Sequence, residues 1–401
     1  VMSFLAKRLK KIKPSPTMSL TSKVTKLLAE GKNIITLGAG EPDFDTAENV
    51  KNFAKDSIDR GDTKYTDVSG TKELKDAIAA KFEKDNELKF STNQLIASCG
   101  GKQVIFNAFM ATINAGDEVI IPAPYWVSYP DMVLLFDGKP VCISCSEKNN
   151  FKLQPDDLDR AITKKTKWLI VNSPCNPTGT VYSKEELKAL SEVLLKHPNV
   201  LILSDDIYEH VIYNDLRFHT IAQVEPKLFD RTLTMNGVSK SYAMTGWRIG
   251  FAGGSQELIG AMGKVQSQGT SSPSSISQAA AVEALVGDQS YVKERSLSFM
   301  ERRDYVVQFL NQISGISCLS PNGTFYTYPS CGDLIGKKTN SGKSIQSDGD
   351  FAMYLLEEVG VAVVPGEAFG SSHFFRISFA TSMEKLKEAC DRIKQAVSNL
   401  S

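Results

Sequence analysis

A single lysine, Lys240, stands among small residues in NGVSKSYAMTGWRIG, which spans residues 236–250 and contains no acidic side chain. Other polar groups also follow apolar runs of strand length: Asn176 after KWLIVN, and Asp205 and Tyr208 after NVLILS. Taken singly, an aspartate in such a place often caps a helix, and most lysines are simply solvated. Ligands of parallel α/β sheets, however, bind beyond the carboxyl ends of the strands. We therefore expect this amine, amide, carboxylate and phenol to share one crevice.

One cofactor, pyridoxal phosphate, uses all of these groups. The amine of Lys240 would form a Schiff base with the cofactor's aldehyde, ready for exchange with an amino acid. The ring withdraws electrons only while its nitrogen is protonated, so a carboxylate such as that of Asp205 must face it. Phenol and amide donors, here Tyr208 and Asn176, would hold the phenolate oxygen of the ring.

The phosphate of this cofactor requires a cationic fork and free backbone N–H groups. Arg248 in GWRIG would supply the fork. Gly100 and Gly101 in SCGG, which precede an apolar helical stretch, suit the second requirement. The indole of Trp126 in APYWVSYP would stack on the ring.

These residues depend on a regular alternation of elements between about residues 47 and 290. Strands are expected at 117–122, 139–144, 167–172, 199–204, 231–236 and 248–254, and helices at 71–85, 100–113, 183–197, 290–313 and 382–398. Several strand runs are apolar throughout, which is typical of parallel strands covered on both faces. The sequence predicts an α/β fold. A large domain (46–300) would hold a mostly parallel sheet flanked by helices, and a smaller α+β domain (1–45 and 301–401) would close over the site.

The composition excludes several classes of partner. Basic and acidic residues number 46 each, so a net charge of zero gives no general attraction to nucleic acid or anionic membranes. No apolar run is long enough to span a bilayer, and the N-terminus lacks the apolar core of a secretory signal, so we expect a cytoplasmic protein. The histidines form no ligand-spaced cluster, and Cys142 and Cys145 are expected to be core cysteines. No metal site is therefore predicted.

The motifs LGAGEPDF, TKYTDVSG, GGKQ, PAPYWVSYP, NSPCNPTG, SDDIYEH, NGVSKSYAMTGWRIG and FFRISFAT carry a resemblance. The chain resembles the class I, fold-type I pyridoxal-phosphate aminotransferases. Over nearly its whole length it is similar to the bacterial group that contains aspartate and aspartate/prephenate enzymes. Two departures show: Asp206 stands where the family often has Glu, and Gly237 where some relatives use a serine to bind the phosphate.

The resemblance implies a role for each site residue. Lys240 would be the Schiff-base lysine and would carry the proton between substrate and cofactor, while Asp205 pairs with the ring nitrogen. The implied cofactor-binding set is Gly100, Gly101, Trp126, Asn176, Asp205, Tyr208, Ser239, Lys240 and Arg248, joined by Tyr65 from the other subunit of a homodimer that shares its active sites.

Substrate recognition is expected to rest on cations. Arg376 in FFRISFA would bind the substrate α-carboxylate with help from Gly38 and Asn176, although an internal salt bridge is the alternative for a buried arginine. Lys102 would bind a distal carboxylate, or else be a solvated lysine in the first turn of a helix. Trp126 would also contact the substrate, and Ser19 or Leu20 and Thr21 would lie near the entrance.

The function expected from these residues is transfer of an amino group between L-aspartate and 2-oxoglutarate by a ping-pong route. Prephenate, a bulkier dicarboxylate, is an alternative or additional substrate. Less favoured alternatives are β-elimination on the same cofactor, which would release pyruvate and ammonia, and a non-catalytic module of this fold. A regulator of that kind needs a basic DNA-binding extension, for which the chain has no room before residue 14.

Overall fold

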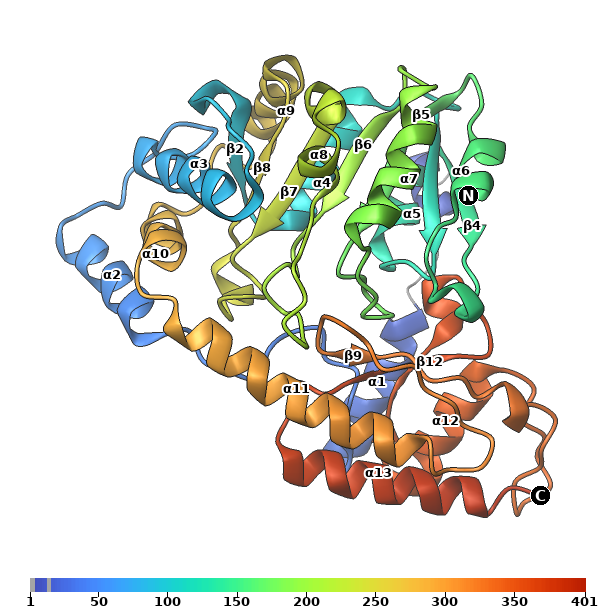
Figure 1. The fold of residues 1–401 in the computed structure, drawn as a ribbon. Helices are drawn as coiled ribbons and strands as arrows, with labels where there is room; N and C mark the ends of the chain where they lie inside the picture. The colour runs from blue at the N-terminus through green and yellow to red at the C-terminus, as the bar shows by residue number, and fades with distance from the viewer. Residues whose placement is uncertain (1–3, 13–15) are drawn as a thin grey trace.

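The computed structural model describes residues 4–12 and 16–401. Its largest sheet has seven strands in the order β2-β8-β7-β6-β5-β3-β4 (Figure 1). The strands are β2 (Leu95–Ser98), β3 (Glu118–Ala123), β4 (Lys139–Ser144), β5 (Thr166–Asn172), β6 (Leu201–Asp205), β7 (Thr232–Gly237) and β8 (Gly250–Gly253). The neighbours from β4 through β7 pair in parallel, whereas β8 runs antiparallel to both β7 and β2. The mostly parallel sheet expected from the sequence is confirmed.

Helices cover both faces of this sheet because its strands bury apolar side chains on both sides. Trp168 and Ile170 of β5 pack on one face against α4 (Gly101–Thr112), α5 (Ser128–Leu135) and α9 (Gln256–Gly269). Leu169 and Val171 pack on the other face against α6 (Pro155–Ala161), α7 (Lys184–Leu195) and α8 (Ile221–Val224). Beside β2 and β8 lie α2 (Glu48–Asp59), α3 (Lys72–Asn86) and α10 (Ser275–Val286).

Local capping rules set where α7 begins. The hydroxyl of Ser183 accepts a hydrogen bond from the backbone N–H of Glu186 at 3.1 Å, and the Glu186 carboxylate accepts one from the Ser183 N–H at 2.7 Å. This reciprocal pair satisfies two of the free N–H groups at a helix start. The helix expected at 183–197 is therefore present, and this capping box sets its start.

A smaller domain contains antiparallel strands and joins both ends of the chain. Its elements are α1 (Pro16–Ala29), α12 (Asp348–Val359), α13 (Met383–Ser398) and the sheet β11-β12-β9, formed by β11 (Val364–Pro365), β12 (Phe375–Ser378) and β9 (Tyr326–Thr327). Helix α11 (Ser290–Leu310) leads into it, because its first turn packs on the large domain and its later turns on the smaller one. Strand β1 (Ile35–Thr36) pairs in parallel with β10 (Val361–Ala362). In Figure 1 the blue helix α1 accordingly lies among the orange and red elements.

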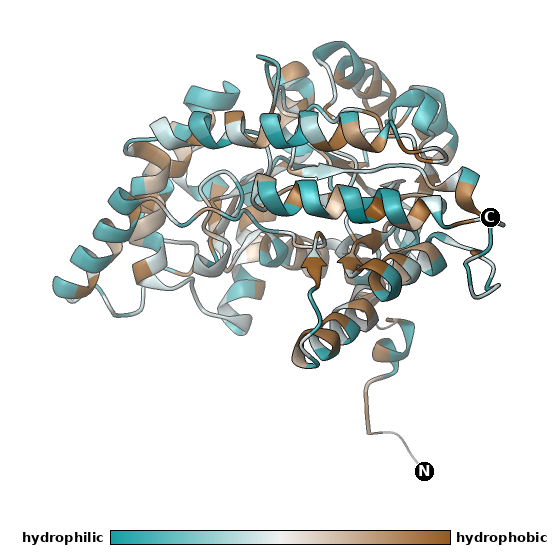
Figure 2. Cartoon of the chain, turned by 90° about the horizontal axis from the view of Figure 1, so that it is seen from below, coloured by the Kyte–Doolittle hydropathy of each residue, from teal (hydrophilic) through white to brown (hydrophobic). Residues whose placement is uncertain are grey.

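The outer helices of this smaller domain are amphipathic. In α13, Leu386, Ala389, Ile393 and Ala396 recur every three or four positions and are fully buried. Figure 2 shows hydrophilic residues along the outer faces of the helices on this side of the molecule. Such a stripe stabilises a helix mainly by packing its apolar face onto the core.

One expectation about the cysteines is wrong. Cys145 is buried, but Cys142 is exposed. Both belong to the region of β4, which is the edge strand of the sheet and alternates between exposed and half-buried side chains.

Among the described residues, no helix is both long enough and apolar enough to cross a membrane.

Candidate active site

A cavity of about 670 Å³ lies at the carboxyl ends of β5, β6 and β7. The strand register places Asn172 beside Asp205, and Asp205 beside Met235, so polar groups at these ends converge as expected. Of the predicted site residues, the cavity is lined by Gly38, Gly101, Lys102, Trp126, Asn176, Asp205, Tyr208, Ser239, Lys240, Arg248 and Arg376.

Lys240 lies in the loop after β7 and extends into the cavity. Its amine donates a hydrogen bond to the carbonyl oxygen of Gly40 and lies 5.8 Å from the centre of the Tyr208 ring. Burial, followed by repulsion from Arg376, lowers the pKa of Lys240 to about 8. A substantial fraction of this amine is therefore neutral near physiological pH, as a nucleophile or base requires.

Asp205 is only 3% exposed, and its carboxylate is held from two sides. The hydroxyl of Tyr129 donates to Oδ2 at 2.5 Å, and the backbone N–H of Ile207 donates to Oδ1 at 3.3 Å. Burial raises the pKa of Asp205 to about 6, although the bond from Tyr129 opposes this shift. Tyr129 was not among the site residues predicted from the sequence. Its position three residues after Trp126, in the same motif, was the available signal, and the two rings pack edge to face at 5.3 Å.

Arg376 is buried, and no carboxylate of the described residues pairs with it. Its Nη1 donates to Asn176 Oδ1 at 2.8 Å and its Nη2 to the Gly38 carbonyl at 2.9 Å. No ion pair involving Arg376 occurs in the described part of the chain, so the internal salt-bridge alternative is not supported. Its Nε is buried and has no hydrogen-bond partner within the part of the chain that the structure describes. The guanidinium thus retains donors for a carboxylate ligand, which pairs well with its planar fork.

At one end of the cavity, glycines leave room beside a cation. Gly100 has φ +88°, and a Cβ there would lie 2.2 Å from Nη2 of Arg248. The following residue, Gly101, begins α4, whose first N–H groups have no partner within the helix. At Gly237 a Cβ would lie 2.9 Å from Cδ1 of Ile207 and 3.0 Å from the carbonyl oxygen of Ile249, so a serine there would crowd the neighbouring backbone.

The remaining predicted residues fall at different distances from this centre. Lys102 places its amine 4.9 Å from the centre of the Trp126 ring, and both line the cavity. Leu20 and Thr21 also line it, whereas the side chain of Ser19 falls outside what the structure describes. Tyr65 is 95% exposed and does not contact the cavity of its own chain.

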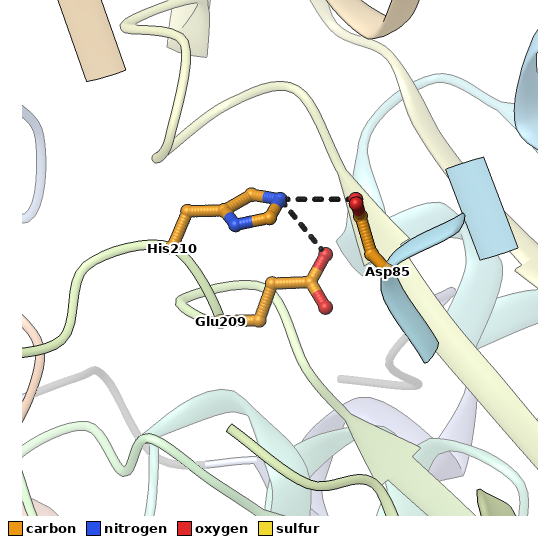
Figure 3. Close-up of side chains that lie close together, drawn as sticks. All are labelled: Asp85, Glu209 and His210. Carbon is orange, nitrogen blue, oxygen red and sulfur yellow. Dashed lines mark ion pairs between the residues drawn. The ribbon is translucent and has the colours of Figure 1, made fainter. Parts of the chain in front are cut away.

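A separate charged cluster, whose members do not line the cavity, comprises Asp85, Glu209 and His210 (Figure 3). The His210 Nε2 is 3.4 Å from an oxygen of each carboxylate. The spacing resembles that of metal ligands, which the sequence analysis did not find. The ammonium of Lys81, however, contacts Glu209 and lies 3.6 Å from Asp85, so a cation of the chain itself already pairs with both carboxylates.

The comparisons with known proteins agree with this geometry. The family model described as aminotransferase class I and II matches residues 32–393. The chain belongs to this family.

Related aminotransferases match over the full length. A probable aspartate/prephenate aminotransferase from Rhizobium leguminosarum bv. phaseoli is 58% identical and is matched over 98% of both chains. The crystal structure of the aspartate aminotransferase from Rhizobium meliloti has a TM-score of 0.98 at 54% identity, with 100% of both chains covered. The aspartate aminotransferase from Thermus thermophilus with maleate has a TM-score of 0.92 at 39% identity, covering 98% of this chain and 100% of that one.

The cofactor of these aminotransferases is pyridoxal 5′-phosphate, and the site fits it. Gly100 leaves a concavity beside Arg248 and a helix N-terminus, which suits a phosphate. Between this end and Arg376, the cavity offers a buried carboxylate, Asp205, and an amine with a lowered pKa, Lys240. These are the groups that a protonated pyridine and an aldehyde require.

Proposed function

We propose that this aminotransferase exchanges the amino group between L-aspartate and 2-oxoglutarate, giving oxaloacetate and L-glutamate by a ping-pong route. The observation that carries this proposal is the presence of Arg376 and Lys102 in the same cavity as Lys240. Arg376 provides for the α-carboxylate and Lys102 for a distal carboxylate. The name of the Rhizobium meliloti relative and the dicarboxylate maleate in the Thermus structure support the same substrate class.

In this proposal each side chain has a defined task. When bound, pyridoxal phosphate supplies an aldehyde that takes up amino groups and a ring that stabilises negative charge at the substrate α-carbon. Lys240 removes the proton from that carbon and returns one during the exchange. Asp205 keeps the ring nitrogen protonated, and Tyr208 and Asn176 donate to the ring oxygen. Trp126 covers the ring and contacts substrate, and the phosphate is held by Gly100, Gly101, Ser239 and Arg248.

The low dielectric of the cavity favours these tasks. Arg376 reaches its substrate carboxylate already fixed by Asn176 and Gly38, so little reorganisation is needed on binding. Because Arg376 also lowers the pKa of Lys240, binding of a carboxylate to it should offset that repulsion. Substrate binding would thereby raise the basicity of Lys240 at the moment when it must take a proton.

We also propose a cytoplasmic homodimer in which Tyr65 reaches the partner's phosphate site. The 95% exposure of this aromatic residue supports the idea, since exposed large apolar surface often marks an interface. The large domain would span 46–300, and the small domain, 1–45 with 301–401, would close over the substrate. The pairing of β1 with β10 supports joining the two ends of the chain.

A half-reaction tests the central claim. The purified holoenzyme is mixed with aspartate alone, and the absorbance of its cofactor is followed while oxaloacetate is measured. We expect the band to shift and stoichiometric oxaloacetate to appear. If glutamate shifts the band and aspartate does not, the aspartate assignment is wrong.

Prephenate is the second candidate substrate. The observation in its favour is the name aspartate/prephenate aminotransferase carried by the relative from Cereibacter sphaeroides, which is 55% identical over the full chain. Prephenate carries the same kinds of carboxylate on a bulkier ring, which the cavity of about 670 Å³ would have to accommodate. Formation of arogenate from prephenate with aspartate or glutamate as donor would establish this activity, and its absence would exclude it.

A further inference from the structure

Tyr326 connects two parts of the cavity that have so far been treated separately. It lies on β9, and β9 pairs with β12, the strand that carries Arg376. The Tyr326 hydroxyl is 2.8 Å from the hydroxyl of Tyr208, and its ring centre is 4.2 Å from Cζ of Arg376. The side chain is fully buried yet lines the cavity.

Once the cofactor is bound, the hydrogen bond between the Tyr326 and Tyr208 hydroxyls would run in one direction. A phenol has a single proton to donate, and its oxygen also accepts. If Tyr208 donates its proton to the ring oxygen of the cofactor, its own oxygen is left to accept from Tyr326. A group that receives a hydrogen bond in this way donates more strongly, because chains of hydrogen bonds polarise one another.

The contact between the Tyr208 and Tyr326 hydroxyls lies close to backbone and to several charged groups. A Cβ at Gly40 would lie 3.4 Å from the Tyr326 hydroxyl, so the backbone closes over it. Arg376 and Glu41 are the charged groups that act on Tyr326, and Asp205 and Lys240 lie near Tyr208. A single hydrogen bond in such an environment has a larger effect than one at the surface.

We propose that Tyr326 is a positioning residue that links the carboxylate site at Arg376 to the ring-binding hydroxyl of Tyr208. This inference rests on the proposed function, because it assigns Arg376 to substrate and Tyr208 to the cofactor. The Tyr326 hydroxyl orients and strengthens the donation by Tyr208. Its ring supports the guanidinium plane through a cation–π contact. The two halves of the residue therefore act on different properties of the enzyme.

The first test removes only the hydroxyl. In Tyr326→Phe holoenzyme, weaker donation by Tyr208 stabilises the phenolate of the cofactor ring less. We expect the midpoint of the pH titration of the cofactor's absorbance to rise by several tenths of a pH unit, with weaker retention of the cofactor. The KM for aspartate should change little, because the aromatic face below Arg376 remains. An unchanged midpoint would overturn the proposal, even if thermal stability falls.

The second test asks whether the effect passes through Tyr208. In a Tyr208→Phe background, adding Tyr326→Phe should produce no further shift of the titration midpoint. An equal shift in both backgrounds would refute the route through Tyr208. Tyr326→Leu, which also removes the ring, should raise the KM for aspartate several-fold above that of Tyr326→Phe, and equal KM values would refute the role of the ring.

The proposed function is tested apart from this inference. Wild-type enzyme that binds the cofactor but does not respond to aspartate would remove the substrate assignment. The titration midpoints of the Tyr326 and Tyr208 variants would still report whether the two hydroxyls are coupled. Loss of coupling with a normal aspartate half-reaction would remove only the inference about Tyr326.

Discussion

The end of β6 and the turn after it, Asp205 to Glu209, contribute buried polar side chains to two different regions of the molecule. Asp205 and Tyr208 line the cavity, whereas Asp206 contacts Ser204 and Thr220, and Glu209 contacts Lys81 and Asn86 of α3. All four are at most 3% exposed, so burial does not distinguish the two regions. Their hydrogen-bond partners do.

In the interior, the carboxylate of Glu209 is held by one cation and two amide groups. Its carboxylate receives Lys81, Asn86 at 2.9 Å and Asn236 at 2.8 Å. In the cavity, by contrast, neither Lys240 nor Arg376 forms an ion pair with a carboxylate among the residues described. Among the described residues, the cations of the cavity are therefore left to pair with an anionic ligand, whereas Lys81 in the interior is already paired with Glu209.

The largest effect is expected at Lys240. Lys240→Ala removes both the amine that holds the cofactor and the proton carrier, so turnover of aspartate should fall by at least about a thousandfold. Steady-state assays measure the loss, and borohydride reduction followed by mass analysis should find no cofactor on the peptide containing residue 240. Lys264→Ala, at an exposed lysine on α9, is the control. Retained turnover in Lys240→Ala would end the assignment.

The interior region should respond in stability instead. Glu209→Gln leaves Lys81 buried with no carboxylate of equal proximity, and removal of one member of a buried ion pair costs about 3–5 kcal/mol of unfolding free energy. Denaturant titration of the holoenzyme measures the change. Glu83→Gln on α3, which disrupts an exposed pair with Lys89 beyond the end of that helix, should cost under about 1 kcal/mol. Equal costs for both variants would contradict the contrast drawn here.

Arg376→Leu should affect binding of every substrate. Hydrogen bonds to charged groups contribute about 1.5–3 kcal/mol, so the apparent KM for each amino acid should rise by about 10- to 100-fold. Arg217→Leu, at an exposed arginine, should leave KM near that of the wild type. A rise confined to dicarboxylates would mean that Arg376 binds the distal carboxylate instead.

Lys102→Ala should give a smaller and selective effect. Because Lys102 is more accessible than Arg376, we expect the KM for aspartate to rise by about five- to tenfold, near the lower end of a charged hydrogen bond. Alanine and aromatic donors should be almost unaffected. Equal damage to alanine and aspartate would remove Lys102 as the residue that selects dicarboxylates.

A pH-dependent effect is expected at Asp206. Burial raises the pKa of Asp206 from 3.8 to about 8, and one of its carboxylate oxygens has no hydrogen-bond partner among the described residues. A raised pKa in the folded state favours the neutral form, so its contribution to stability is complete below about pH 4 and is lost as pH rises to about 8. Asp206→Asn, which stays neutral at every pH, should therefore become progressively more stable than the wild type as the pH rises from about 4 to about 8. Thermal melts from pH 4 to 8 measure it, and a constant difference would contradict the shift.

The site was predictable where it follows from strand ends. Asn176, Asp205 and Lys240 each come after an apolar run, and parallel pairing necessarily brings such ends together. Their motifs also carry the family resemblance. The alternation of strands and helices predicted the large sheet for the same reason, since runs that are apolar on both faces require cover on both faces.

What the sequence did not show depends on distant partners. Tyr129 and Tyr326 read as ordinary core aromatics until their hydroxyls are seen 2.5 Å from Asp205 and 2.8 Å from Tyr208. The exposure of Cys142 depends on β4 being an edge strand, which follows from strand order and not from the local pattern. Lys81 could not be assigned to Glu209 because the two lie on elements far apart in the chain.

The pairing of β1 with β10 affects how the newly synthesised chain folds. The carbonyls of Gly38 and Gly40, just beyond β1, receive hydrogen bonds from Arg376 and Lys240, yet β10, the strand that pairs with β1, lies far later in the sequence. On the ribosome β1 therefore cannot pair until β10 and the segments between them have been synthesised. We expect nascent chains to acquire a competent pocket only after β10 has emerged, so that uptake of the vitamin-derived coenzyme follows the pairing of these two strands.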